Sequence, residues 1–183
     1  MLEKILAYHC SPAMAGIKPS NIVTCQKDKF PDVKEQIKEL NDKLNQRDIY
    51  IEVLCECPKH SLLIVYKKSK LIEQLSNKDV QAFLKEYGYK PNGSLDDYLN
   101  KLRENLHCDH FPHEIGCFLG YPLHDINGFI NYKGQDYLYV GPWKVYADVE
   151  NAQKMFNRYK NCSKSILRRV LKGQRLTQIF CAA

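Results

Sequence analysis

Two runs of branched and aromatic residues, joined by a short segment that contains Pro58, constrain the fold of this chain most. Residues 49–54 read Ile-Tyr-Ile-Glu-Val-Leu, and residues 61–66 read Ser-Leu-Leu-Ile-Val-Tyr. Such composition favours extended strands, so the pair predicts a β-hairpin or two neighbouring strands. The longest wholly apolar or aromatic run, residues 62–66, is far too short to span a membrane.

Apolar residues recur at helical spacing in several other segments, and Ser76, Asn77 and Ser94 are candidate N-terminal caps. The longest helix is expected to run from about Val149 to Leu171. Two short helices are expected between residues 111 and 129, joined at residues 120–122. Further helices are predicted over 31–44, 71–75, 77–87 and 94–106, strands over 22–25 and 137–140, a helix or strand over 1–9, and a structured loop over 10–20.

This order of elements predicts an α+β fold, with a small, mostly antiparallel sheet, helices packed on it and a long C-terminal helix. At 183 residues the chain fits one domain, residues 1–183. Its 44% hydrophobic and 26% charged residues exclude general disorder. Glu3, Lys4 and His9 interrupt the first ten residues, so no secretory segment is expected and the predicted location is cytoplasmic.

The net charge of +6 is unevenly distributed. Residues 151–183 contain no acid and carry +8, whereas the first 150 residues carry −2. The basic side chains would form a stripe on the last helix that could contact nucleic-acid phosphates. Such stripes are more often solvated faces, and no nucleic-acid motif accompanies this one, so we do not expect a nucleic-acid partner. The stripe consists of Lys154, Arg158, Lys164, Arg168 and Lys172.

Cys10 lies in a loop with Pro12, directly after His9 and upstream of Lys18. Nearby cations lower the pKa of a thiol, which favours a nucleophilic or redox cysteine. Adjacent residues on an extended chain point apart, so His113 is a better candidate base than His9. The alternative is a buried Cys10 whose loop merely packs under the core, since free cysteine is among the most buried residue types.

His113 and Glu114 follow Pro112 and precede Gly116, an arrangement that predicts the first turn of a helix. Free backbone amides at such a terminus attract anions. Glu114 could orient the His113 imidazole, or it could be only a favourable acid in the first turn.

Trp143, Lys144 and Tyr146 form a third candidate group with Tyr121. On a strand, Trp143 would face one way and Lys144 and Tyr146 the other. Lys144 and Tyr146 could then line a pocket suited to an anionic or planar ligand. In the alternative, Trp143 anchors the core and Lys144 is solvated.

The eight cysteines do not predict a disulfide framework or a standard zinc site. A reducing cytosol argues against disulfides, and the spacing lacks paired CxxC motifs. Two clusters of cysteine and histidine contain residue types that bind zinc, but their irregular spacing fits no standard zinc finger, so no metal site is predicted. Cys57-Pro58 also resembles a haem-responsive dipeptide, a very weak signal. The clusters are His107, Cys108, His110, His113 and Cys117, and Cys55, Cys57 and His60.

Three blocks of sequence resemble the domain-of-unknown-function family 3793, which is common in anaerobic bacteria. They are residues 9–20 (HCSPAMAGIKPS), residues 111–130 (FPHEIGCFLGYPLHDINGFI) and residues 141–146 (GPWKVY). Their order and spacing match over essentially the whole chain. Cys117 departs from the pattern, in which an aliphatic residue is usual. The resemblance implies which positions matter and implies no activity.

Together these observations predict one pocket that binds or transforms a small anionic metabolite. If the protein is an enzyme, Cys10 would be the nucleophile or redox thiol, His113 the general acid/base, Glu114 its orienter, and Lys18 or Lys144 the anion stabiliser. No cofactor or oligomeric state is indicated. The alternative is a non-catalytic regulatory protein linked to metal or haem or binding a partner. The ligand-binding candidates are His9, Ser11, Tyr121, Trp143, Lys144 and Tyr146.

Overall fold

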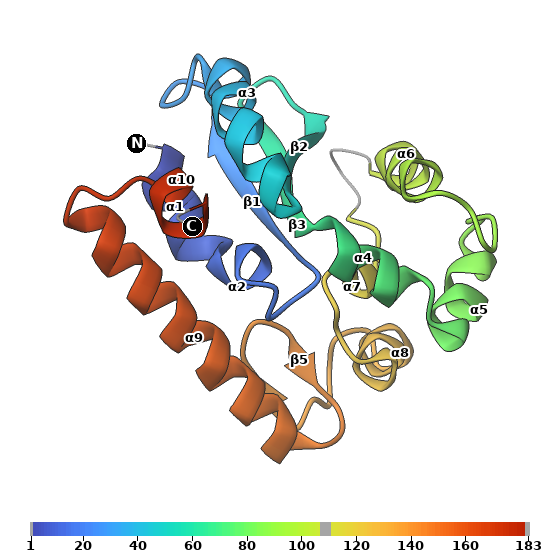
Figure 1. Ribbon diagram of the computed structural model, residues 1–183. Helices are drawn as coiled ribbons and strands as arrows, with labels where there is room; N and C mark the ends of the chain where they lie inside the picture. Colours follow the sequence, from blue (N-terminus) through green and yellow to red (C-terminus); the bar gives the residue numbers. More distant parts are fainter. Residues whose placement is uncertain (1, 107–110, 182–183) are drawn as a thin grey trace.

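The computed structural model describes residues 2–106 and 111–181 and has a three-stranded antiparallel sheet at its centre (Figure 1). Strands β1 (Ser20–Gln26), β3 (His60–Lys67) and β2 (Ile49–Glu56) lie side by side in that order. The predicted hairpin is confirmed, with Ile51 opposite Val65. A β-bulge at Leu54 shifts the register, so that Val53 pairs with Leu63 and Cys55 with Leu62.

The central strand β3 is buried on both of its faces. Leu63 and Val65 belong to one hydrophobic cluster, whereas Leu62, Ile64 and Tyr66 belong to another on the opposite face. Helices cover both sides of the sheet, and this explains why residues 62–66 are continuously apolar instead of alternating with polar residues.

The helices nearest the two termini, together with α3, cover one face of the sheet (Figure 1). Residues 2–9 form a helix, and the predicted loop after them contains a short helix that has Pro12 in its first turn. The long helix α9 begins and ends as predicted, whereas the short helix after it, α10, was not predicted. These elements are α1 (Leu2–His9), α2 (Ser11–Met14), α3 (Val33–Leu44), the 3₁₀ turn η1 (Asn45–Arg47), α9 (Val149–Leu171) and α10 (Leu176–Cys181).

Five helices from the middle of the chain cover the other face. The Asn77 side chain accepts hydrogen bonds from the backbone of Asp79 (2.9 Å) and Val80 (3.2 Å), and Ser94 forms a capping box with Asp97. The predicted caps Asn77 and Ser94 are therefore confirmed, whereas the alternative, Ser76, lies at the C-terminal end of the preceding helix. The helices are α4 (Lys68–Leu75), α5 (Lys78–Glu86), α6 (Leu95–Asn105), α7 (Ile115–Phe118) and α8 (Leu123–Asn131).

A second, two-stranded sheet connects α8 to the long helix α9. Its strands are β4 (Tyr139–Val140) and β5 (Lys144–Val145). Trp143 is buried and its ring packs edge-on against Phe156 of α9, 4.5 Å between centroids. The predicted fold class, α+β with a long C-terminal helix, is confirmed. No helix in the described part of the chain is long and apolar enough to cross a membrane.

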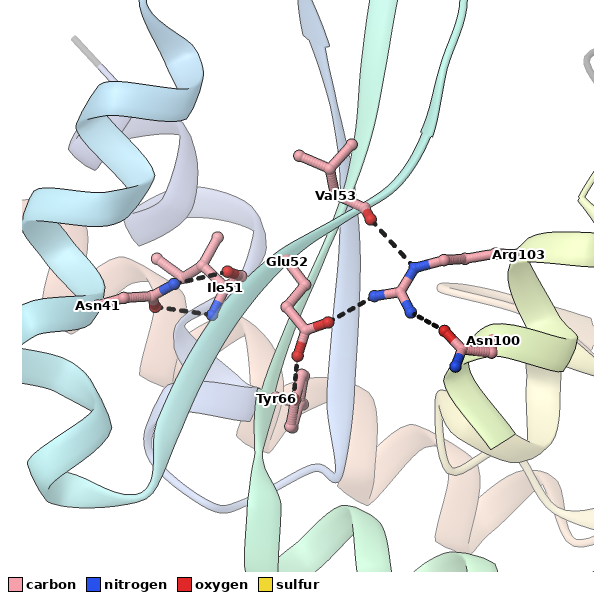
Figure 2. A network of polar contacts seen from close by, with 7 residues as sticks. All are labelled: Asn41, Ile51, Glu52, Val53, Tyr66, Asn100 and Arg103. Carbon is pink, nitrogen blue, oxygen red and sulfur yellow. Dashed lines mark hydrogen bonds and ion pairs between the residues drawn. The ribbon is translucent and has the colours of Figure 1, made fainter. Parts of the chain in front are cut away.

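A polar network ties the sheet to helix α6 (Figure 2). The Glu52 carboxylate accepts hydrogen bonds from the Tyr66 hydroxyl and from Arg103, whose Nη2 lies 2.5 Å from Oε2. Arg103 also donates to the Val53 carbonyl (3.4 Å) and to the Asn100 side chain (2.8 Å). Burial, and then the bond to Glu52, raise the pKa of Tyr66. Arg103 therefore links α6 to strand β2 through a side-chain and a main-chain contact.

Replacing Arg103 with alanine removes its ion pair with Glu52 and is expected to lower the free energy of unfolding. The loss should be only about 1 kcal/mol, because the pair is partly exposed to solvent. Urea denaturation measures this loss. The matched control is Lys101→Ala on the same helix, whose pair with Glu104 (3.2 Å) is on the surface and contributes little. Equal losses in the two variants would contradict a specific role for the Arg103 network.

Candidate functional site

Two neighbouring pockets bring most of the predicted site residues together, with Tyr121 as their shared wall. The larger one, about 600 Å³, is lined by His9 and Lys18, and we call it the Lys18 pocket. The smaller one, about 400 Å³, is lined by His113, Trp143 and Lys144, and we call it the Trp143 pocket. The residues that line both are Ile22, Leu119, Tyr121, Gly141 and Pro142.

The start of β1 is docked on the turn between α7 and α8, and this docking places Lys18 beside Tyr121. The Ser20 hydroxyl donates a buried hydrogen bond to the Phe118 carbonyl (2.7 Å). Gly120 has φ +70°, and a Cβ atom there would lie 2.7 Å from the ring of Pro19. Only glycine permits both this backbone conformation and this close approach.

Lys18 is a buried cation with no charged partner. Its side chain is 5% exposed and forms no hydrogen bond or ion pair with any described residue. The Nζ atom lies 5.1 Å from the centroid of the Tyr121 ring and 5.7 Å from that of Tyr159. Burial lowers the pKa of Lys18 to about 8, and the charge of the Cys10 thiolate would act in the opposite direction.

The other charged residues of the Lys18 pocket are also basic. Helix α9 supplies Lys160 and Lys164, so part of the predicted basic stripe faces this pocket. His9 contributes an imidazole that packs edge-on against Tyr8, and partial burial lowers the pKa of His9. None of the described residues that line the pocket is acidic, so the pocket is suited to an anion.

Cys10 does not reach either pocket, which argues against the predicted nucleophile. The residue is completely buried in the cluster beneath β1, and burial raises the pKa of its thiol far above the ordinary value. The alternative of a buried packing cysteine describes it better. Ser11 is buried as well, and its hydroxyl donates to the Ala7 carbonyl (2.5 Å). Ser11 therefore lines neither pocket, in contrast to its prediction as a ligand-binding residue.

His113 and Glu114 point to different surroundings and do not form the predicted pair. Helix α7 begins at Ile115, later than expected, and His113 is exposed in the preceding turn, with its ring 5.2 Å from that of Phe129. Glu114 is buried on the other side, where it accepts hydrogen bonds from Asn105 (2.8 Å) and Tyr89 (3.4 Å). The expectation that Glu114 orients His113 is therefore wrong.

The Trp143 pocket depends on Asp125, which sequence reasoning missed. This buried carboxylate accepts hydrogen bonds from Trp143 Nε1 (2.8 Å), the Tyr146 amide (2.7 Å) and the Ala147 amide (3.3 Å). It thereby fastens the β4–β5 hairpin to α8. The single acid in the mostly apolar stretch 115–130 is the signal that could have identified it.

Lys144 and Tyr146 differ in their access to the pockets. Lys144 lines the Trp143 pocket, but its Nζ atom already donates to the Gly134 carbonyl (2.6 Å) and lies 4.8 Å from the centroid of the Tyr137 ring. Tyr146 lines neither pocket, because its ring stacks on Tyr132. The expectation that these two residues share a pocket is therefore wrong.

No group of three or more His, Cys, Asp or Glu side chains among the described residues is arranged to hold a metal ion. Cys117 is fully buried, and burial raises its pKa to about 12, whereas His113 is exposed. Cys57-Pro58 forms part of the turn between β2 and β3, in which the Cys57 amide donates to the His60 carbonyl (2.8 Å). His107, Cys108 and His110 lie outside the described residues.

The sequence reasoning also missed the contribution of α9 to the Lys18 pocket. Tyr159 and Ser163, like Lys160 and Lys164, are four residues apart and share one helical stripe. The periodicity predicts Tyr159 in the core and Lys164 on a solvated face. A pocket can form where the boundary between the apolar and the basic face of a helix lies beside another part of the chain.

A family model described as "Protein of unknown function (DUF3793)" matches residues 6–180. The chain belongs to this family. The resemblance indicated by the three sequence blocks is thus confirmed, and the match covers every residue that lines the two pockets of this DUF3793 protein. Comparison with curated proteins and with solved structures finds no match.

Proposed function

We propose that this DUF3793 protein binds a small organic anion in the Lys18 pocket. The observation that carries the proposal is the buried Lys18 ammonium, which has no counter-ion among the described residues. Burying a charge without a partner is costly, and proteins normally pair such groups. An anionic ligand at Nζ would supply the missing partner.

The surroundings of Lys18 support this choice of ligand. Lys160 and Lys164 add positive charge at the same pocket, and no acidic side chain competes for them there. The Lys18 ammonium lies over the faces of the Tyr121 and Tyr159 rings, so cation–π attraction positions it at the pocket without neutralising its charge. The volume of about 600 Å³ accommodates a metabolite-sized ligand.

The Trp143 pocket would hold the uncharged part of a larger ligand. Its walls are mostly apolar, with side chains such as Ile115, Ile126 and Phe129, and it adjoins the Lys18 pocket at Tyr121. Among the described residues that line this pocket, His113 is the one with an imidazole, and it is exposed. We therefore assign to His113 the proton-transfer role in the proposal.

Trp143 is the only tryptophan of the chain, and it provides the test. Its ring stacks on Tyr121, 4.5 Å between centroids, and the Lys18 ammonium faces that same tyrosine. Titration with lactate and pyruvate, two small carboxylates, is expected to change the Trp143 fluorescence saturably for at least one of them. Lys18→Gln should weaken that binding at least tenfold, since a charged hydrogen bond contributes about 1.5–3 kcal/mol.

The matched control is Lys172→Gln, which removes an exposed cation at the end of α9. It should leave the dissociation constant within about twofold, since an exposed charge at that distance is screened by salt. If Lys18→Gln and Lys172→Gln bind the probe equally well, Lys18 is not the anion site and the proposal fails.

One observation favours the alternative of a partner-binding protein. Residues 137–140 read Tyr-Leu-Tyr-Val and are all exposed, Leu138 most of all at 66%. Tyr139 and Val140, however, each line one of the two pockets, which accounts for part of this exposure. Anion binding is the function that the geometry supports better.

A further inference from the structure

The amine of Lys18 has the surroundings of a nucleophile. It is buried at the wall of a pocket, no carboxylate among the described residues pairs with it, and two aromatic rings lie beside it. A lysine that is desolvated in this way is populated as the neutral amine, and neutral amines attack carbonyl carbons.

We propose that Lys18 Nζ forms an imine with its ligand, so that the ligand class is a small organic anion that carries an aldehyde or ketone carbonyl. This inference rests on the proposed function, because the anionic group brings the carbonyl to Lys18. It adds a covalent step that anion binding alone does not require.

The step needs no oxidant or reductant. The lone pair of the neutral amine attacks the carbonyl carbon, and the new N–C bond forms as the C=O π bond breaks. A proton passes from nitrogen to the resulting oxygen to give a carbinolamine. This intermediate loses its hydroxyl group together with the second N–H proton as one molecule of water, which leaves the C=N bond.

Such a ligand requires a cation for its carboxylate and a neutral amine for its carbonyl, and different lysines of the pocket can provide them. The exposed cations Lys160 and Lys164 can hold a carboxylate, so Lys18 need not act as the anion's only partner. A Cys10 thiolate would favour the protonated form of Lys18, but burial keeps this thiol neutral. The pKa of Lys18, about 8, leaves about a tenth of the amine neutral at pH 7.

Lys144 shows the contrast within the same protein. It also lies near aromatic rings at a pocket, but it is only half-buried and its Nζ atom already donates to the Gly134 carbonyl (2.6 Å). The imine is therefore assigned to Lys18 alone of the two predicted anion-binding lysines.

Reductive trapping tests the imine. The full chain is incubated with pyruvate, a small 2-oxo acid, and sodium cyanoborohydride, and the lysine adducts are mapped by peptide mass spectrometry. Lys18 is expected to be modified at least tenfold faster than Lys172, an exposed lysine outside the pocket. Propanal, a carbonyl compound without the carboxylate, should show at most a small preference for Lys18.

Lactate separates this inference from the proposed function, because it keeps the carboxylate but has no carbonyl. Lactate should change the Trp143 fluorescence on binding without any trapped adduct on Lys18. If lactate and pyruvate bind but Lys18 is trapped no faster than Lys172, the imine is wrong and anion binding stands. If neither binds, both proposals fall.

Discussion

Replacing Asp125 with alanine should lower the free energy of unfolding by about 3–5 kcal/mol, the largest single effect expected in this protein. The carboxylate is 2% exposed and accepts three hydrogen bonds, from Trp143 Nε1 and from the amides of Tyr146 and Ala147. Its loss leaves buried donors without partners, and each such donor costs about 1–3 kcal/mol. Urea denaturation followed by circular dichroism measures the change.

The fluorescence of Trp143 gives a second readout of the same variant. Without the bond to Asp125 the indole should become more exposed, and its emission should move to longer wavelength before global unfolding begins. Asp125→Asn keeps one acceptor oxygen and should lose roughly half as much stability. Asp42→Ala is the control, since Asp42 is exposed on α3. A loss no greater than that of Asp42→Ala would contradict the role of Asp125 as the anchor of the hairpin.

Replacing Lys18 with methionine should stabilise the empty protein, by about 2–3 kcal/mol at pH 7. Methionine has a similar reach and no charge, so the cost of burying the ammonium is removed. A gain in stability together with a loss of anion binding would identify Lys18 as a residue kept for its ligand and not for the fold.

The gain should depend on pH with a definite sign. An unfolded lysine keeps its proton up to about pH 10.5, whereas burial lowers the pKa of folded Lys18 to about 8. Between these values the unfolded wild-type chain binds more protons than the folded one, so the Lys18 contribution to stability rises with pH. The advantage of Lys18→Met should therefore be largest below pH 8 and shrink from pH 8 to pH 10.

Comparing the two proteins at each pH isolates Lys18 from its neighbours. The thiol of Cys10 and the hydroxyls of Tyr121 and Tyr159 also titrate at raised pKa values, but they are present in both chains. Urea midpoints measured from pH 6.5 to 10 provide the comparison. A constant difference across that range would show that Lys18 does not titrate as a buried, unpaired ammonium.

Local signals in the sequence were sufficient for most elements and insufficient for the site. The Ser94 cap and the apolar spacing of α9 identify those helices because capping and periodicity act within a few residues. Helix α7 was placed three residues too early, because Pro112 suits a first turn whether or not the helix forms there. Helix α10 was missed, since six residues carry too little periodicity to be recognised.

The sequence by itself determined the family, the α+β class, the central strand and the long helix, because these follow from motifs and from hydrogen bonding between near neighbours. Only the tertiary structure decided that Lys18 lines a pocket while Cys10, eight residues earlier, is sealed in the core. That choice depends on a contact between Ser20 and Phe118, across 98 residues, and on the approach of Tyr159 from α9. Local sequence patterns do not predict which side chain remains accessible at a pocket after such long-range packing.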